Sequence, residues 1–118
     1  RDANGKVFTV AFELDGQEFT GLNAGPQFKF NEAVSMFVNC EDQTEVDYFW
    51  NALTADGGEE SMCSWCKDKY GLSWQIVPKQ LGELMGDPDP EKSQRVMQAM
   101  LKMKKIIVSD LQKAHAGE

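Results

Sequence analysis

The chain has 118 residues, of which 42% are hydrophobic and 26% charged, values that suit one globular domain with a single core. Its 19 acidic residues outnumber its 12 basic ones, and the net charge of −7 disfavours a nucleic acid as partner. No apolar run approaches the ~20 residues of a membrane helix. The 3 cysteines, an odd number, exclude a complete disulfide framework, so we expect a cytoplasmic protein with no membrane contact.

A β-hairpin is predicted near the N-terminus. Residues 6–14 alternate between apolar and polar side chains, a pattern typical of a half-buried strand. Asp15 and Gly16 follow as a two-residue turn, because both residue types tolerate a positive φ. Residues 17–23 then form the returning strand. The predicted apolar face of the first strand carries Phe8, Val10, Phe12 and Leu14.

A strand followed by a helix is predicted next. Residues 33–40 form the strand, and Asp42 can cap the helix, with Glu45 completing a pair that resembles a capping box. The glycines at 57–58 end the helix. One face of the strand carries Ser35, Phe37 and Asn39. The apolar stripe of the helix, which we expect to dock onto a sheet, consists of Val46, Phe49, Trp50 and Leu53.

Two or three short strands are predicted between Glu59 and Val77, with a turn at 68–71 and Pro78 as the stop. Alternation within the last strand puts Ser73, Gln75 and Val77 on one face and Trp74 and Ile76 on the other. We therefore expect Trp74 to pack against the preceding helix. Gln75 is a polar residue on the opposite face of an otherwise apolar strand.

The C-terminal quarter is predicted to be helical. A short helix spans Lys79 to Met85, a second starts at Asp89–Pro90 and runs to about Lys105, and Ser109 caps a last short turn. Residues 92–118 hold 6 basic and 2 acidic side chains, whereas residues 1–91 hold 6 basic and 17 acidic ones. This basic tail therefore either docks on the acidic body of its own chain or of a neighbouring subunit, or presents a solvated helix face. The methionines of the second helix suit a dimer contact or packing within the chain. The order of elements is that of an α+β fold.

Two motifs suggest chemistry that the rest of the chain does not support. The only histidine, His115, lies near the C-terminus, where chains usually fray, so a Ser-His pair or a multi-histidine zinc site is excluded within one chain. Cys63 and Cys66 have CxxC spacing, but even with Cys40 the cysteines fall short of four zinc ligands. The pair also precedes a turn between strands and not a helix, which favours packing over redox chemistry.

The runs AVSMFVNCED, EVDYFWNAL and CSWCKDKYGLSWQIVP, together with the tail LGELMGDPDPEKSQRVMQAMLKMKK, resemble the PhnB-like branch of the vicinal oxygen chelate superfamily. This branch is also labelled demethylubiquinone methyltransferase-like, and the superfamily includes glyoxalases, extradiol dioxygenases and bleomycin-resistance proteins. The resemblance implies glyoxalase-like βαβββ modules that form a curved mixed sheet within one domain, residues 1–118. Residues 6–32 would be the second half of a first module lacking its first strand and helix, residues 33–78 the second module, and residues 79–118 a helical tail.

The resemblance also implies where ligands would bind. Many members carry a metal-binding Glu on the last strand, where this chain has Gln75. The remaining inward candidates are neutral, whereas divalent cations prefer carboxylates or imidazoles, so we expect no metal and no cofactor. A methyl-donor site is not expected either, because the Gly-rich turn of nucleoside-binding sheets is missing from the sequence. The residues expected to line a site for a small organic ligand are Ser35, Phe37, Asn39, Trp65 and Gln75.

Three hypotheses for function follow. The first is a homodimer that binds a small organic ligand in the concavity of the sheet, with Gln75 as polar anchor. The second is a metal-dependent enzyme of glyoxalase or dioxygenase type, which would need further ligands besides Gln75. The third is a module used only for assembly through its helical tail. Neither catalysis nor a catalytic residue follows from the sequence.

Overall fold

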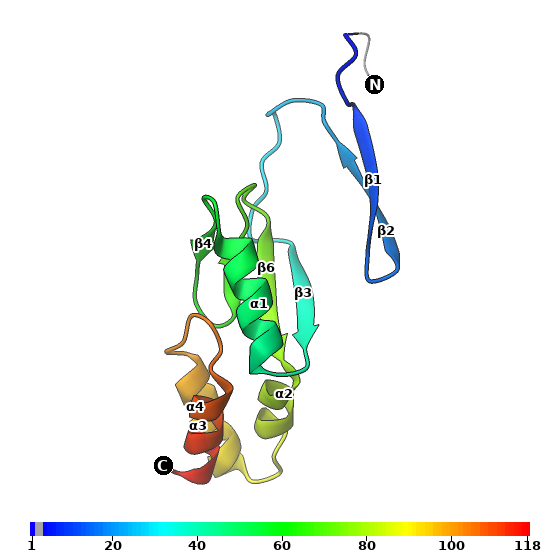
Figure 1. The fold of residues 1–118 in the computed structure, drawn as a ribbon. Coiled ribbons are helices and arrows are strands. Elements are labelled where there is room, and N and C mark those ends of the chain that lie inside the picture. Colours follow the sequence, from blue (N-terminus) through cyan, green and yellow to red (C-terminus); the bar gives the residue numbers. More distant parts are fainter. Residues whose placement is uncertain (2–3) are drawn as a thin grey trace.

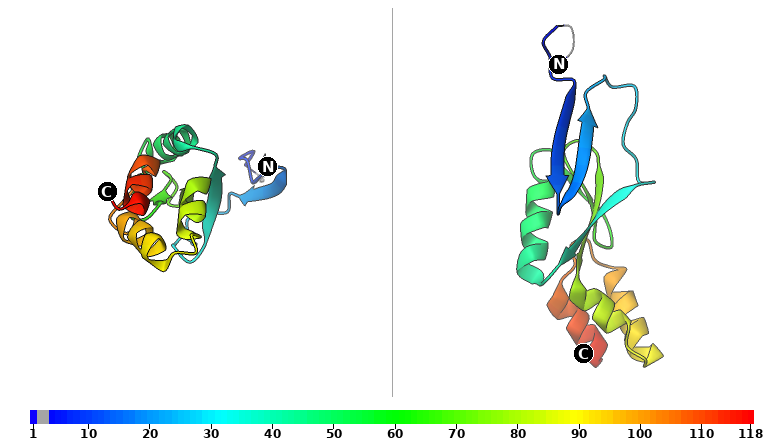
Figure 2. Two further views of the ribbon diagram at one scale, coloured as in Figure 1. Left: turned by 90° about the horizontal axis from the view of Figure 1, so that it is seen from below. Right: turned by 90° about the vertical axis from the view of Figure 1, so that its right-hand side faces the viewer.

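The computed structural model, which describes residues 1 and 4–118, contains an N-terminal β-hairpin and a larger α+β unit (Figure 1). The molecule is elongated, with extents of 62 × 26 × 23 Å, and the C-terminal helices lie at the end opposite the N-terminus (Figures 1 and 2). The elements in chain order are β1 (Thr9–Leu14), β2 (Gln17–Leu22), β3 (Ser35–Cys40), α1 (Gln43–Thr54), β4 (Glu59–Glu60), β5 (Trp65–Lys67), β6 (Ser73–Pro78), α2 (Lys79–Met85), α3 (Pro90–Met100) and α4 (Val108–Ala116).

The N-terminal hairpin has the predicted strands and turn. β1 and β2 pair antiparallel, and Asp15 and Gly16 adopt φ angles of 50° and 79° at the turn. Phe12 and Phe19 stack across the two strands with ring centroids 5.7 Å apart. The expectation of a half-buried strand was wrong for this chain, because the hairpin stands away from the larger unit and every residue of β1 is exposed (Figure 1).

The second sheet has the strand order β3-β6-β5-β4. β3 runs parallel to β6, whereas β5 is antiparallel to both β6 and β4. Helix α1 covers one face of this sheet (Figure 1), and the core between them consists of Cys40, Val46, Trp50, Cys66 and Ile76. Trp74 packs against the same core, as the alternation of β6 predicted. Successive side chains of a strand point to opposite faces. The residues next to Cys40, Cys66 and Ile76 in β3, β5 and β6 therefore lie on the face opposite α1.

The predicted caps hold α1 in place. The carboxylate of Asp42 accepts a hydrogen bond from the backbone N–H of Glu45 at 3.0 Å. Glu45 in turn accepts from the N–H of Glu41 at 2.6 Å, so the pair works as a capping box displaced by one residue. The helix ends before Asp56 and Gly57, both of which have positive φ angles.

The prediction that α3 reaches Lys105 was wrong, since the helix ends at Met100. Beyond this point, the backbone carbonyls of Met103 and Lys104 accept hydrogen bonds from the N–H groups of Cys63 and Ser64, at 2.8 and 3.0 Å. The N–H groups of Lys102 and Met103 donate to the carbonyls three residues back, at 3.2 and 2.9 Å, so the helix ends in a tighter turn. The segment that the sequence pattern assigned to the helix is thus bound by the loop before β5.

The last helix is longer than the predicted turn, and Ser109 does not cap it. α4 begins at Val108, whose N–H donates to the side-chain oxygen of Gln43 at 2.7 Å. The amide nitrogen of Gln43 donates to the carbonyl of Ile106 at 2.9 Å and to Asp47 at 3.0 Å. One side chain at the start of α1 thus satisfies backbone groups on both sides of Ile107.

We expect Gln43→Leu to lower the free energy of unfolding by about 2 kcal/mol, because it leaves a donor and an acceptor of a half-buried segment without partners. Hydrogen exchange of the amides of α4 should accelerate together with this loss. Urea unfolding and exchange measured by NMR would check both. Gln112→Leu is the matched control, since Gln112 is an exposed glutamine of α4 itself. Equal exchange in the two variants would contradict the role of Gln43.

The three C-terminal helices form a second core, which consists of Leu81, Val96, Ile106 and Leu111. Met100 and Met103 pack against it, so these methionines serve packing within the chain. The basic tail also docks on its own acidic body, since Lys105 forms an ion pair with Asp47 at 2.8 Å. No helix among the described residues has the length and apolar character needed to cross a membrane.

The end of α4 is held by two side chains, contrary to the expectation of fraying. His115 contacts Asp87 at 2.7 Å, and Arg95 donates to the carbonyls of Ala114 and His115 at 2.9 and 2.7 Å. Gly117 closes the helix with a left-handed φ of 84°. His115 therefore has a structural contact in the tail and lies in a different part of the fold from the sheet face described next.

Candidate functional site

The candidate site is the face of the second sheet opposite α1. The register of the strands places Phe37 opposite Gln75 on one side and Trp65 opposite Gln75 on the other. Ser35 and Lys67 flank Ser73 in the same way. All five residues predicted to line a ligand site, Ser35, Phe37, Asn39, Trp65 and Gln75, therefore belong to this one face of three adjacent strands.

Gln75 lies in the middle strand of this face and has a protein partner. Its side-chain nitrogen donates a hydrogen bond to the hydroxyl of Ser35 at 2.8 Å. This bond fixes the amide in one orientation, so that a ligand would meet a positioned polar group and not a freely rotating one. Asn39 follows Phe37 on the same face of β3, with the aromatic ring between the two polar positions.

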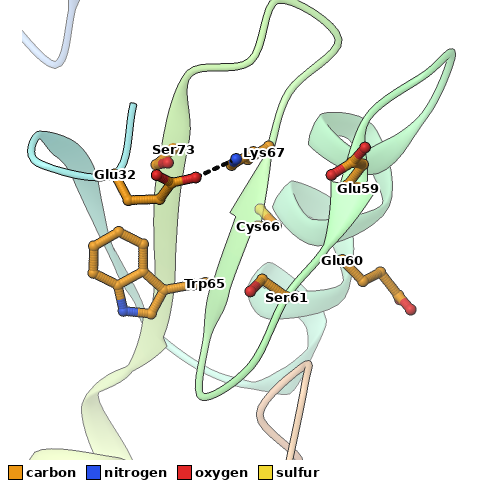
Figure 3. Close-up of a pocket in the computed structure, with 8 residues that line it drawn as sticks. All are labelled: Glu32, Glu59, Glu60, Ser61, Trp65, Cys66, Lys67 and Ser73. Atoms are coloured by element: carbon orange, nitrogen blue, oxygen red, sulfur yellow. Dashed lines mark ion pairs between the residues drawn. The ribbon is translucent and has the colours of Figure 1, made fainter. Parts of the chain in front are cut away.

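One cavity lies on this face, and a second lies at the β3 edge of the sheet, between the hairpin and α1. The first, of about 330 Å³, has Trp65, Lys67 and Ser73 on the sheet and Glu32 and Glu59 at its rim (Figure 3). The second, of about 660 Å³, lies at the β3 edge of the sheet and extends to the side of α1, where Val38, Trp74 and Phe49 line it. Phe37 and Asn39, together with Leu14 and Phe19 of the hairpin, line the rest of it. Of the predicted residues, Trp65 thus belongs to the first cavity and Phe37 and Asn39 to the second, while Ser35 and Gln75 line neither cavity and lie on the strands between them.

An ion pair between Lys67 and Glu32 closes part of the first cavity (Figure 3). The hydrogen bond to Lys67 holds the pKa of the Glu32 carboxyl below its usual value. The same bond raises the pKa of the Lys67 ammonium. Both groups therefore stay charged around neutral pH. Glu32 belongs to the segment that links the hairpin to β3, and no pattern in the sequence predicts that it reaches the sheet.

Ser73 is the functional candidate that sequence reasoning passed over. Its side chain is 1% exposed, and its hydroxyl has no hydrogen-bond partner in the part of the chain that the structure describes. The sequence did place Ser73 on the same face as Gln75, which was the available signal. Its pairing with Lys67 and Ser35, which buries the hydroxyl, depends on strand register and could not be deduced from the residues alone.

Comparison with known proteins identifies the family. The family model described as 3-demethylubiquinone-9 3-methyltransferase matches residues 1–77. A solved structure from Bacillus cereus, a PhnB protein described by the same methyltransferase name, shares 33% identity with the chain. The match covers 66% of this chain and 73% of that chain, with a TM-score of 0.58. The chain belongs to the PhnB-like family. The search of curated proteins found no match.

The α+β architecture, with its mixed four-stranded sheet and C-terminal helices, agrees with the glyoxalase-type fold expected for a PhnB-like protein. The donor set on the open face does not suit a divalent cation. Ser35, Asn39 and Gln75 offer neutral oxygens, and Gln75 Nε2 is a donor to Ser35. Among residues 1 and 4–118, no three side chains of the His, Cys, Asp and Glu types gather in a way that could hold a metal ion.

The CxxC cysteines of this PhnB-like chain point in different directions. Cys66 lies in the core beneath α1, where burial raises the pKa of its thiol to about 11. Burial likewise raises the pKa of the Cys40 thiol to about 11. Cys63 is half-buried in the loop before β5 and has a positive φ of 55°. A thiol that stays protonated at neutral pH is a poor nucleophile, which disfavours a redox role for the pair.

We expect iodoacetamide at pH 8 to label Cys63 within minutes and to leave Cys40 and Cys66 unmodified in the folded protein. At a pKa of about 11, only about a thousandth of these two thiols is ionised at that pH, and both are shielded from the reagent. Mass spectrometry should therefore find one added group in the native protein and three after unfolding in urea. Native labelling of Cys66 at the rate of Cys63 would contradict this assignment.

Proposed function

We propose that this PhnB-like protein binds a small organic ligand on the face of its sheet opposite α1, with Gln75 as the polar anchor. The observation that supports this most is the row formed by Phe37, Gln75 and Trp65 across three adjacent strands. Two aromatic side chains flanking an oriented amide make a surface that can hold a flat apolar body and read one polar group on it. Phe37 on this face is 54% exposed, whereas the face beneath α1 carries the buried core.

The proposal is tested with Gln75→Leu, measured against the unchanged protein. Native mass spectrometry of the purified protein would first reveal any organic adduct retained from the cell. A titration with benzyl alcohol, a flat neutral probe, would then be followed by NMR at the side chain of Gln75 and the indole of Trp65. We expect shifts at both groups, with at least a fivefold loss of affinity in Gln75→Leu.

Gln80→Leu is the matched control, because the side chain of Gln80 donates to the backbone of Glu41 away from this face. Its affinity for the probe should stay within a factor of two. If neither Gln75 nor Trp65 responds to the probe and no adduct is found, the proposal is wrong, and a role in assembly would take its place.

A metal-dependent enzyme of lyase or dioxygenase type is the second candidate, because Gln75 occupies the strand position at which the resemblance expects a ligand residue. Such an enzyme would require carboxylate or imidazole ligands in addition to the neutral side chains of Ser35, Asn39 and Gln75. Native mass spectra recorded after addition of Mn²⁺ or Ni²⁺ would support it if a metal were retained in the unchanged protein and lost in Gln75→Leu. The methyltransferase name of the relatives does not carry over as a proposed reaction, since no nucleoside-binding turn exists in the sequence.

We further propose that the protein assembles as a homodimer in the cytoplasm. Phe8, Val10 and Phe12 of the hairpin are each more than 40% exposed, which is costly for a monomer in water. Among the described residues, β3 pairs with β6 alone, so its second edge is free to pair with a strand of another chain. Light scattering coupled to size-exclusion chromatography should give a dimer mass, and Phe12→Asp should shift it toward the monomer.

A further inference from the structure

Among residues 1 and 4–118, the hydroxyl of Ser73 has no hydrogen-bond partner, although it lies beneath charged groups that could supply one. It is 1% exposed and lines the first cavity below Glu32 and Lys67 (Figure 3). A buried hydroxyl without a hydrogen bond destabilises the fold, so such a group calls for an explanation. The ion pair above it does not provide one, because Lys67 donates to Glu32 and not to Ser73.

The surroundings of this hydroxyl are aromatic and acidic. Trp65 lies on the same side of the sheet as the carboxylate of Glu32, with Ser73 close to both (Figure 3). Around the cavity, the carboxylates of Glu32 and Glu59 face the single ammonium of Lys67, which leaves an excess of one negative charge. Glu60 also lines the cavity, but its carboxylate accepts a hydrogen bond from the indole of Trp50 in the core beneath α1, so it is left out of this count.

Resting on the proposed ligand-binding function, we propose that this cavity is a subsite for a protonated amine carried by the ligand. A carboxylate, the face of an indole and a hydroxyl oxygen are three groups that attract an ammonium together. Glu32 can accept from Lys67 with one oxygen and from the ligand with the other, and Ser73 gains the partner that it lacks. An anionic ligand group would instead meet the excess negative charge and compete with Glu32 for Lys67.

The test compares three small aromatic probes at pH 7 that differ in charge: benzylamine, benzyl alcohol and benzoate. Binding is followed by NMR at the Trp65 indole, whose signal is assigned by its loss in Trp65→Phe. We expect benzylamine to bind at least tenfold more tightly than benzyl alcohol, and benzoate more weakly than both. Glu32→Gln and Ser73→Ala should each weaken benzylamine about tenfold and change benzyl alcohol less than twofold. Glu13→Gln, on the exposed hairpin, is the control and should change neither affinity.

The outcomes separate this subsite from the broader proposal. Equal affinity for benzylamine and benzyl alcohol would overturn the amine subsite and leave ligand binding at Gln75 intact. Tighter binding of benzoate, lost in Lys67→Gln, would overturn it in favour of an anion subsite. The absence of any shift at Trp65 and Gln75 with all three probes would overturn both proposals at once.

Stability gives a second test that needs no ligand. Because Ser73→Ala removes a buried hydroxyl without a partner, we expect the unfolding temperature to stay unchanged or rise by about 2–4 °C. Ser35→Ala should lower it, since that variant removes the acceptor of the bond from Gln75. A fall of several degrees in Ser73→Ala would mean that the hydroxyl already serves the fold, and would overturn its assignment to a ligand.

Discussion

Replacement of Trp50 by alanine is expected to lower the free energy of unfolding by about 3–5 kcal/mol. Trp50 is 1% exposed and lies between α1 and the sheet, among the side chains of Val46, Cys66 and Ile76. Its indole N–H also donates to the carboxylate of Glu60 at 2.8 Å. The substitution therefore removes the largest side chain of this core and leaves a cavity between helix and sheet that neighbouring residues fill only in part.

Urea unfolding monitored by far-UV circular dichroism measures this loss without relying on tryptophan fluorescence. Trp50→Phe helps to separate the two contributions, because it keeps a large apolar ring in the core and removes the bond to Glu60. Asn51→Ala, on the exposed side of α1, is the control and should change stability by less than about 0.5 kcal/mol. A loss below about 1 kcal/mol in Trp50→Ala would mean that the docking of α1 contributes little to the fold.

The order of helices and strands was predictable because each element has a pattern within its own few residues. Alternation identified β1, β3 and β6, and the capping pair at Asp42 and Glu45 marked the start of α1. The same alternation placed Phe37 with Ser35 and Asn39 on one face of β3, and Gln75 with Ser73 on one face of β6. That these two faces coincide was implied by the family resemblance, and the register pairs Phe37 with Gln75. A period of two needs only a few consecutive residues, so the chemistry of each strand face can be deduced without its neighbours.

The features that the sequence pattern missed depend on residues far apart in the chain. The segment after α3 is held by hydrogen bonds from Cys63 and Ser64 to its carbonyls, and α4 begins where Gln43 accepts a hydrogen bond from its first N–H. The approach of Glu32 to Lys67 depends on the path of the segment between two sheets. The division of the predicted site residues between two cavities likewise depends on where the hairpin lies, which its own alternation does not determine.

These long-range contacts explain why the sheet face and the helical tail form one unit. Backbone bonds from Cys63 and Ser64 tie the loop before β5 to the segment after α3, and β5 carries both Trp65 and Lys67 of the proposed subsite. Val77 lies on the same face of β6 as Gln75 and packs against the core of the C-terminal helices. The tail therefore supports the strands that would contact a ligand, although its helices lie outside both cavities.

Gly58→Ala is the second substitution for which we expect a large effect, a loss of about 3 kcal/mol in the free energy of unfolding. A Cβ atom at this position would lie 2.4 Å from the carbonyl oxygen of Leu53, 2.7 Å from the Cα of Thr54 and 2.8 Å from the carbonyl oxygen of Lys67. All three atoms belong to the backbone, so no side-chain rotation relieves the contacts.

The strain is expected to separate the end of α1 from β5 and to displace Glu59, which follows directly and borders the first cavity. Gly82→Ala is the matched control, because a Cβ in this turn of α2 meets nothing within 4 Å and alanine favours a helix by up to about 1 kcal/mol. Chemical denaturation of the two variants should thus show shifts of opposite sign. If Gly58→Ala were as stable as the unchanged protein, the close approach of α1 to β5 would have to be wider than described, and the position of Glu59 at the rim of the cavity would lose its structural basis.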